Sequence, residues 1–147
     1  MAAYDRLNPG DRFVTPARTI SEDARAMIGL AGYVHPMFAG ETHAGPSTAV
    51  TGRPIPGELT LLFLGGLAER TDVFDDTTLA LVSLDAVEFR TPALIGDTIR
   101  LEMEVTGKRR SESRRRGFVT FAWTCGNQRG EIVLTARATF AFRTAEG

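Results

Sequence analysis

The sequence has very little cysteine: Cys125 is the only one in 147 residues. A single cysteine excludes an internal disulfide framework and a metal site built from cysteines alone. The histidines lack the short spacing that is typical of zinc motifs, so neither a metal ion nor another cofactor is expected. Because no histidine lies near it in the sequence, Cys125 is expected to be a buried structural thiol.

Long apolar runs and an excess of positive charge are missing as well. The longest apolar run is about a dozen residues, which is too short to span a bilayer. The first residues, MAAYDRLNPGDRF, lack the apolar centre of a signal peptide. The net charge of −1 gives no reason to expect nucleic-acid binding. We therefore expect a cytoplasmic protein without nucleic-acid or membrane partners.

What is present is the composition of an ordinary globular protein, with 43% hydrophobic and 24% charged residues. A chain of this length buries about two-thirds of its unfolded surface, which is enough for a real core. We therefore expect one domain over residues 1–147.

The first part of the chain predicts a short edge strand and a helix. FVTPARTI, residues 13–20, has strand-forming residues, and Pro16 places it at a sheet edge. Ser21 is a candidate cap for the next helix, in which Ala24, Met27 and Ile28 would form a buried stripe. An irregular stretch with both histidines, His35 and His43, follows over residues 32–56, and such loops are often functional.

GELTLLFLGGLAER, residues 57–70, predicts a buried helix. Its leucines and phenylalanine follow helical spacing and cover nearly all sides. Gly65 and Gly66 each cost about 1 kcal/mol relative to alanine in a helix, so we expect a sheet to pack closely against them.

After Asp76 the apolar period changes from helical to two. Residues 99–105 alternate, with Ile99, Leu101, Met103 and Val105 on one face. GFVTFAWTC and EIVLTARATFAFR are two more strands, joined by the turn GNQRG. Long strands in succession predict an antiparallel sheet, and the buried helix before them predicts a sheet wrapped around a helix.

The arrangement resembles the hot-dog fold, an α+β fold with an antiparallel sheet wrapped around a long central helix. FRTPALIGDTIRLEMEVTGKRRSESRRRGFVTF (89–121) and GNQRGEIVLTARATF (126–140) are similar to the strands of MaoC-like dehydratases, also called hydratase-2 proteins. RTISEDARAMIGLAGYVHPMF and GRPIPGELTLLFLGGL resemble that family's entry helix, active-site overhang and central helix. The resemblance implies action on acyl thioesters of coenzyme A or acyl carrier protein.

The catalytic motif of that family, Gly-Asp-x-Asn-Pro-x-His, is altered here. The matching residues read Gly32-Tyr33-Val34-His35-Pro36-Met37-Phe38, so Tyr33 and Phe38 replace the catalytic Asp and His. The family's His-Gly at the start of the central helix reads Pro56-Gly57. The resemblance therefore implies a dehydratase or hydratase with an atypical site.

Three side chains are candidates for the missing chemistry. His35 can act as acid or base, or can cap a backbone group in its loop. Tyr33 can donate a hydrogen bond to a substrate oxygen, or pack over a tunnel mouth. Glu58 can act as base or nucleophile with a pKa raised by burial, or can stabilise the helix start through the helix dipole.

Substrate binding is assigned to the residues around the helix start. The Gly57 N–H can bind a thioester carbonyl, and Pro56 is placed beside it. His43 is placed there as well if its loop folds back towards Glu58 or His35; otherwise it is a surface loop histidine. The basic run KRRSESRRR, residues 108–116, is interpreted as a solvated hairpin end; contact of its arginines with coenzyme A phosphates is the alternative.

Three functions follow from these candidates. The first is a hydratase or dehydratase that uses His35, Tyr33 and Glu58. The second is a hot-dog acyl-CoA thioesterase with Glu58 as base, and the third is a non-catalytic hot-dog subunit of a heteromer. An exposed edge strand favours pairing of subunits, so we expect a homodimer or a higher oligomer.

Overall fold

The computed structural model describes residues 1–39, 52–111 and 115–145. His43 therefore lies outside the described residues. The helices and strands are α1 (Ala3–Arg6), β1 (Arg12–Val14), β2 (Arg18–Thr19), α2 (Ala24–Leu30), α3 (Pro36–Ala39), α4 (Gly57–Ala68), β3 (Thr78–Phe89), β4 (Thr98–Ser111), β5 (Arg116–Gly126) and β6 (Ile132–Arg143).

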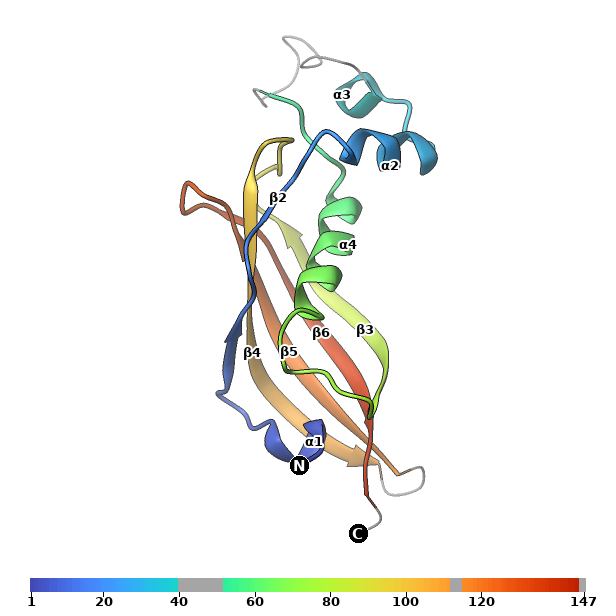
Figure 1. Ribbon diagram of the computed structural model, residues 1–147, viewed down its shortest axis with the longest axis vertical. Coiled ribbons are helices and arrows are strands. Elements are labelled where there is room, and N and C mark those ends of the chain that lie inside the picture. The colour runs from blue at the N-terminus through green and yellow to red at the C-terminus, as the bar shows by residue number, and fades with distance from the viewer. Residues whose placement is uncertain (40–51, 112–114, 146–147) are drawn as a thin grey trace.

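The strands form one antiparallel sheet in the order β1-β4-β5-β6-β3, and β2 pairs with β4 beside this path. The sheet curves around α4, while α2 and α3 lie beyond the N-terminal end of α4 (Figure 1). This is the hot-dog fold, so the predicted sheet around a central helix is confirmed. The expected strand over 13–20 is interrupted near Pro16 and forms the two short strands β1 and β2.

The core lies between the concave face of the sheet and α4. On β4, the alternating residues Ile99, Leu101, Met103 and Val105 are at most 1% exposed, as their spacing predicts. On β5, the inward residues are Val119, Phe121, Trp123 and Cys125. Cys125 is buried, which confirms the expectation of a buried thiol.

Helix α4 supplies the other side of the core. Phe63, Leu64 and Leu67 are buried, but Leu62 is 60% exposed, so one side of the helix is open. Apart from the neighbouring residues in the chain and the backbone of the helix itself, no described atom lies within 4 Å of a Cβ built on Gly65 or Gly66. The expectation that a sheet packs closely against these glycines is therefore wrong. In the described ranges, no helix is long and apolar enough to cross a membrane.

Helix α2 differs from its prediction in two ways. The Ser21 side chain is not its cap: the N-cap is Asp23, which makes no side-chain capping bond, and the Ala24 N–H donates to the Ser21 carbonyl at 3.1 Å. The predicted buried stripe holds for Ala24 and Ile28 only. Met27 is 37% exposed because it faces an open cavity beside α4.

The Gly-Asp turn before β4 is bonded to the turn between β5 and β6. Gly96 has φ +101°, which favours glycine. The Asp97 carboxylate, 3% exposed, accepts hydrogen bonds from the Leu94 N–H at 3.0 Å, Gln128 Nε2 at 2.9 Å and Arg129 Nη1 at 3.0 Å. Burial raises the pKa of Asp97, but these bonds outweigh that effect and hold the pKa below its ordinary value. This turn therefore stabilises the fold.

The described part of the basic run lies at the end of the molecule opposite α2 and α3 (Figure 1). Lys108 Nζ donates to the carbonyls of Tyr4 and Leu7 at 2.7 and 2.8 Å, and so holds α1 on the sheet. Arg110 donates to the Ala145 carbonyl at 3.2 Å. These contacts fit the interpretation as a hairpin end, and they place the two side chains far from the helix start in the same chain.

Candidate functional site

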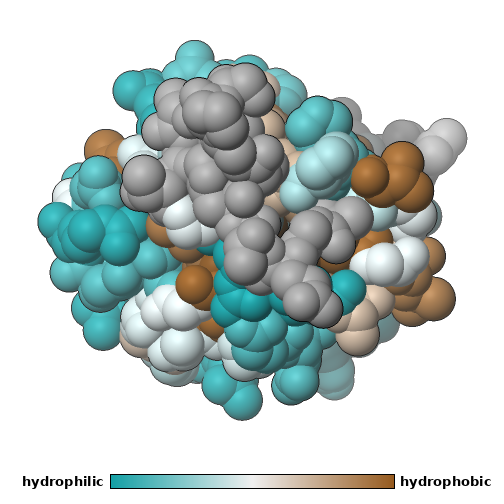
Figure 2. Space-filling view, turned by 90° about the horizontal axis from the view of Figure 1, so that it is seen from above, coloured by the Kyte–Doolittle hydropathy of each residue, from teal (hydrophilic) through white to brown (hydrophobic). Residues whose placement is uncertain are grey.

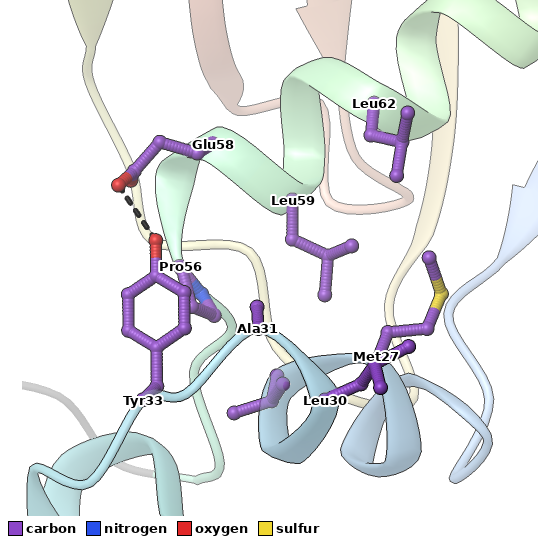
Figure 3. A pocket seen from close by; sticks show the side chains of 9 residues that line it. Met27, Leu30, Ala31, Tyr33, Pro56, Glu58, Leu59 and Leu62 are labelled. Atoms are coloured by element: carbon purple, nitrogen blue, oxygen red, sulfur yellow. Dashed lines mark hydrogen bonds between the residues drawn. The ribbon is translucent and has the colours of Figure 1, made fainter.

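Two of the candidate side chains meet where α2 and α4 come together. Tyr33 follows α2, and Glu58 is the second residue of α4. The Tyr33 hydroxyl donates a hydrogen bond to Glu58 Oε2 at 2.6 Å (Figure 3). Residues 25 positions apart in the sequence are thus joined at the N-terminal end of the central helix.

The hydrogen bond fixes the protonation of both groups. It is the main cause that lowers the pKa of Glu58 from its ordinary 4.5 and raises the pKa of Tyr33 from its ordinary 10.0. Glu58 is exposed, so burial has only a minor effect there, and the expectation of a raised Glu58 pKa is wrong. At neutral pH the site therefore holds an ionised carboxylate and a protonated phenol.

A cavity of about 330 Å³ opens on one side of this pair, between α2 and α4. Tyr33 and Glu58 lie at one end of it, and Met27 and Leu62 lie at the other (Figure 3). All other lining residues are apolar: Met27, Ile28, Leu30, Ala31, Pro56, Leu59 and Leu62. Seen from this end of the molecule, hydrophobic patches reach the surface between hydrophilic ones (Figure 2).

A second cavity of about 420 Å³ lies on the other side, and Glu58 lines both. Gly57, Phe89 and Arg90 are part of its wall. A Cβ built on Gly57 would lie 2.3 Å from Cε1 of Phe89, so the aromatic ring occupies the space of a side chain at position 57. A side chain at position 57 would therefore require the Phe89 ring to move, independent of any use of the Gly57 N–H.

His35 does not join the other two candidates. Its Nδ1 accepts a hydrogen bond from the Met37 N–H at 3.1 Å at the start of α3, which is the backbone-capping role considered from the sequence. The imidazole is exposed and lines neither cavity. Phe38, at the family's histidine position, instead packs edge-on against Tyr33 with ring centroids 5.6 Å apart.

The cavity walls contain both predicted and unpredicted residues. Pro56 and Gly57, which were predicted to bind substrate, line one cavity each. Met27, Leu62 and Phe89, by contrast, carry no polar group and gave no chemical signal. The helical spacing of Glu58 and Leu62, four residues apart, was a usable signal, because residues i and i+4 share a helix face. Within the described ranges, no group of three or more His, Cys, Asp or Glu side chains is placed to hold a metal ion.

Comparison with solved structures identifies the neighbours of this fold. A monoamine oxidase regulatory protein from Archaeoglobus is 26% identical, with a TM-score of 0.84 over 97% of this chain and 95% of its own. A MaoC-like dehydratase from Rhodospirillum rubrum is 22% identical, with a TM-score of 0.82 and 97% of both chains covered. The R-hydratase PhaJ1 from Pseudomonas aeruginosa is 21% identical, with a TM-score of 0.76 over 97% of this chain and 86% of its own.

No family model matches the sequence, and no curated protein matches it. The structural likeness thus shows the fold: a hot-dog domain of the shape found in MaoC-like dehydratases and R-hydratases.

Proposed function

We propose that this protein is a hydratase or dehydratase acting on acyl thioesters of coenzyme A or acyl carrier protein. The observation that carries the proposal is the 2.6 Å hydrogen bond between Tyr33 and Glu58 at the start of α4, between two cavities. The fold supports it, because neighbours of this shape are described as MaoC-like dehydratases and R-hydratases. The pair takes the place of the Asp and His that the family motif would supply.

The chemistry of hydration needs a base for water and an acid for the α-carbon. In this proposal the Glu58 carboxylate accepts a proton from water while the water oxygen adds to the β-carbon of the enoyl thioester. The Tyr33 phenol gives its proton to the α-carbon and is reprotonated by Glu58 through their hydrogen bond. The Gly57 N–H, at the positive end of α4, stabilises charge on the thioester oxygen. Dehydration is the reverse.

A thioesterase is the second candidate, favoured by the exposure and lowered pKa of Glu58. An ionised carboxylate open to solvent can activate water for attack on the thioester carbonyl. In that case the carbon–sulfur bond breaks and free thiol leaves, whereas hydration leaves the thioester intact.

The test is mass spectrometry after incubation with enoyl-, 3-hydroxyacyl- and saturated acyl-CoA. We expect a change by one water on an intact thioester. Release of free coenzyme A would favour the thioesterase instead. If the thioesters stay unchanged at high protein concentration, both reactions are contradicted, and the non-catalytic subunit is the remaining candidate.

The pH dependence follows from the two shifted pKa values. Activity needs Glu58 ionised and Tyr33 protonated, so we expect a plateau that falls only below the ordinary Glu58 pKa of 4.5 and above the ordinary Tyr33 pKa of 10.0. Tyr33→Phe removes the hydrogen bond that lowers the Glu58 pKa, so the acid limb of the remaining activity should move to higher pH. If the acid limb of the kcat/KM profile does not move, ionisation of Glu58 does not control the activity.

We also propose that the protein is a homodimer joined through β3. This strand is at the sheet edge and exposes apolar side chains on both faces, including Leu81 at 45% and Val82 at 48%. Such an edge favours pairing with another strand, and lysine opposes it. Leu81→Lys should therefore lower the mass measured by light scattering from dimer to monomer, while Ile132→Lys, at a residue 46% exposed, should leave it unchanged. If light scattering gives the mass of a monomer for the wild-type protein, the proposed dimer is contradicted.

A further inference from the structure

We propose that the outer face of the sheet, the face away from α4, carries a binding site for a phosphate group. Three arginines form it, one from each of three adjacent strands: Arg109 of β4, Arg116 of β5 and Arg143 of β6. These parts of the strands lie at the end of the molecule opposite α2 and α3 (Figure 1). The site is therefore separate from Tyr33 and Glu58, and the inference does not depend on the proposed reaction.

The register of the strands puts the three arginines on one face. Val119 of β5 is fully buried and belongs to the inward side chains. Because side chains alternate along a strand, Phe118 and Arg116 point outward. Arg109 lies opposite Phe118, and Arg143 lies opposite Arg116. Residues directly opposite each other share a face, so all three arginines point outward, and all three are exposed.

Other arginines on the outer face are neutralised by carboxylates. Arg137 of β6 binds both carboxylate oxygens of Asp85, at 2.8 and 2.6 Å. Arg12 of β1 forms ion pairs with Glu102 and Glu104. In the described part of the chain, by contrast, no carboxylate forms an ion pair with any of the three arginines of the proposed site. Their positive charge is therefore left for a ligand.

Two of these charges repel each other. Arg116 and Arg143 are direct cross-strand partners. The Cβ atoms of such partners lie about 5 Å apart, and like charges placed there destabilise a sheet. A bound anion is attracted by both guanidinium groups and offsets this repulsion. The sheet thus has a reason to take up an anion at this place.

The side chains fit the geometry of phosphate. The guanidinium of Arg109 stacks on Phe118, with its Cζ 4.2 Å from the ring centroid, and so is held in place before a ligand binds. Ser111 lies opposite Arg116 on the same face and adds a hydroxyl donor. Guanidinium groups bind phosphate through two parallel N–H bonds each. A phosphate group has the charge and the number of oxygens to use several of these donors, whereas a carboxylate has one charge and two oxygens.

The experiment is calorimetric titration of the full chain with inorganic pyrophosphate. We expect binding that weakens as salt is added. Arg116→Gln and Arg143→Gln should each weaken it by about tenfold. Arg116→Lys keeps the charge but loses the paired N–H groups, so its affinity should fall between those of the wild type and Arg116→Gln. Arg100→Gln is the matched control, because Arg100 is exposed on the outer face near the other end of β4.

Thermal unfolding gives a second readout. A ligand that binds only the folded chain raises the unfolding temperature. Pyrophosphate at a concentration 100 times the wild-type Kd should raise it by about 5–10 °C in the wild type and in Arg100→Gln, and by much less in Arg116→Gln. Without pyrophosphate, Arg116→Gln should unfold at the wild-type temperature or above, because the repulsion from Arg143 is gone.

Flotation with vesicles of equal parts phosphatidylglycerol and phosphatidylcholine identifies the source of the phosphate. Binding of pyrophosphate alone assigns a free phosphorylated compound. Binding of vesicles that is lost in Arg116→Gln and kept in Arg100→Gln assigns a lipid headgroup, and either result supports the site. If neither probe binds, or if Arg100→Gln weakens binding as much as Arg116→Gln, the site is overturned. Equal binding of succinate, a dianion with two carboxylates, would overturn the assignment to phosphate.

Discussion

Glu58→Gln is expected to lower turnover of the acyl thioester by about 10²–10⁴-fold, the range for loss of a general base. The substitution keeps the shape of the side chain and can still accept the hydrogen bond from Tyr33, whose donor–acceptor distance is 2.6 Å. It removes the negative charge that takes the proton from water. The loss should therefore be in kcat, with little change in the temperature of unfolding.

The matched control is Glu69→Gln. Glu69 is also exposed and is the C-cap of the same helix, at the end away from Tyr33. This variant should keep wild-type turnover. Equal rates for Glu58→Gln and wild type would exclude Glu58 as the base, and equal losses in both variants would point to a general effect of charge on α4.

Leu64→Ala should lower the free energy of unfolding by about 2–5 kcal/mol, the range for leucine-to-alanine changes in a core. Leu64 is fully buried on the side of α4 that faces the sheet. The loss combines the lost burial of the side chain with the cavity left behind, because the sheet relaxes only in part. Urea titration followed by the fluorescence of Trp123, the only tryptophan, measures it.

Leu62→Ala is the same change two residues earlier on the same helix. Leu62 is 60% exposed, so its loss should cost well under about 1 kcal/mol, as at most exposed positions. A large loss at Leu62 would show that this side chain is covered by another subunit. A small loss at Leu64 would contradict the packing of α4 on the sheet.

The strands and the central helix could be predicted because their patterns are long and regular. Met103 and its neighbours on β4 alternate over many residues, so one face had to be apolar. The same reasoning failed for Met27. Its place in a helical period is compatible both with a core and with an apolar cavity, and only the position of α4 decides between them.

The site could be predicted in part. Tyr33 and Glu58 were both candidates, but their hydrogen bond could not be foreseen, since it depends on how α2 meets α4. The pKa of Glu58 was predicted in the wrong direction for the same reason: neighbours in the sequence are leucines, whereas its neighbour in space is a phenol. The contact of Phe89 with Gly57 joins residues far apart in the chain and gave no local signal.

The burial of Cys125 has a practical consequence for spectroscopy. Burial raises the pKa of its thiol to about 12, and the reactive form of cysteine is the thiolate. In the folded protein, maleimides should therefore leave it unmodified. A cysteine introduced at an exposed residue such as Leu30 would carry a fluorophore or spin label alone, with Cys125 left in place. Slow modification of Cys125 itself would then report how often the core opens.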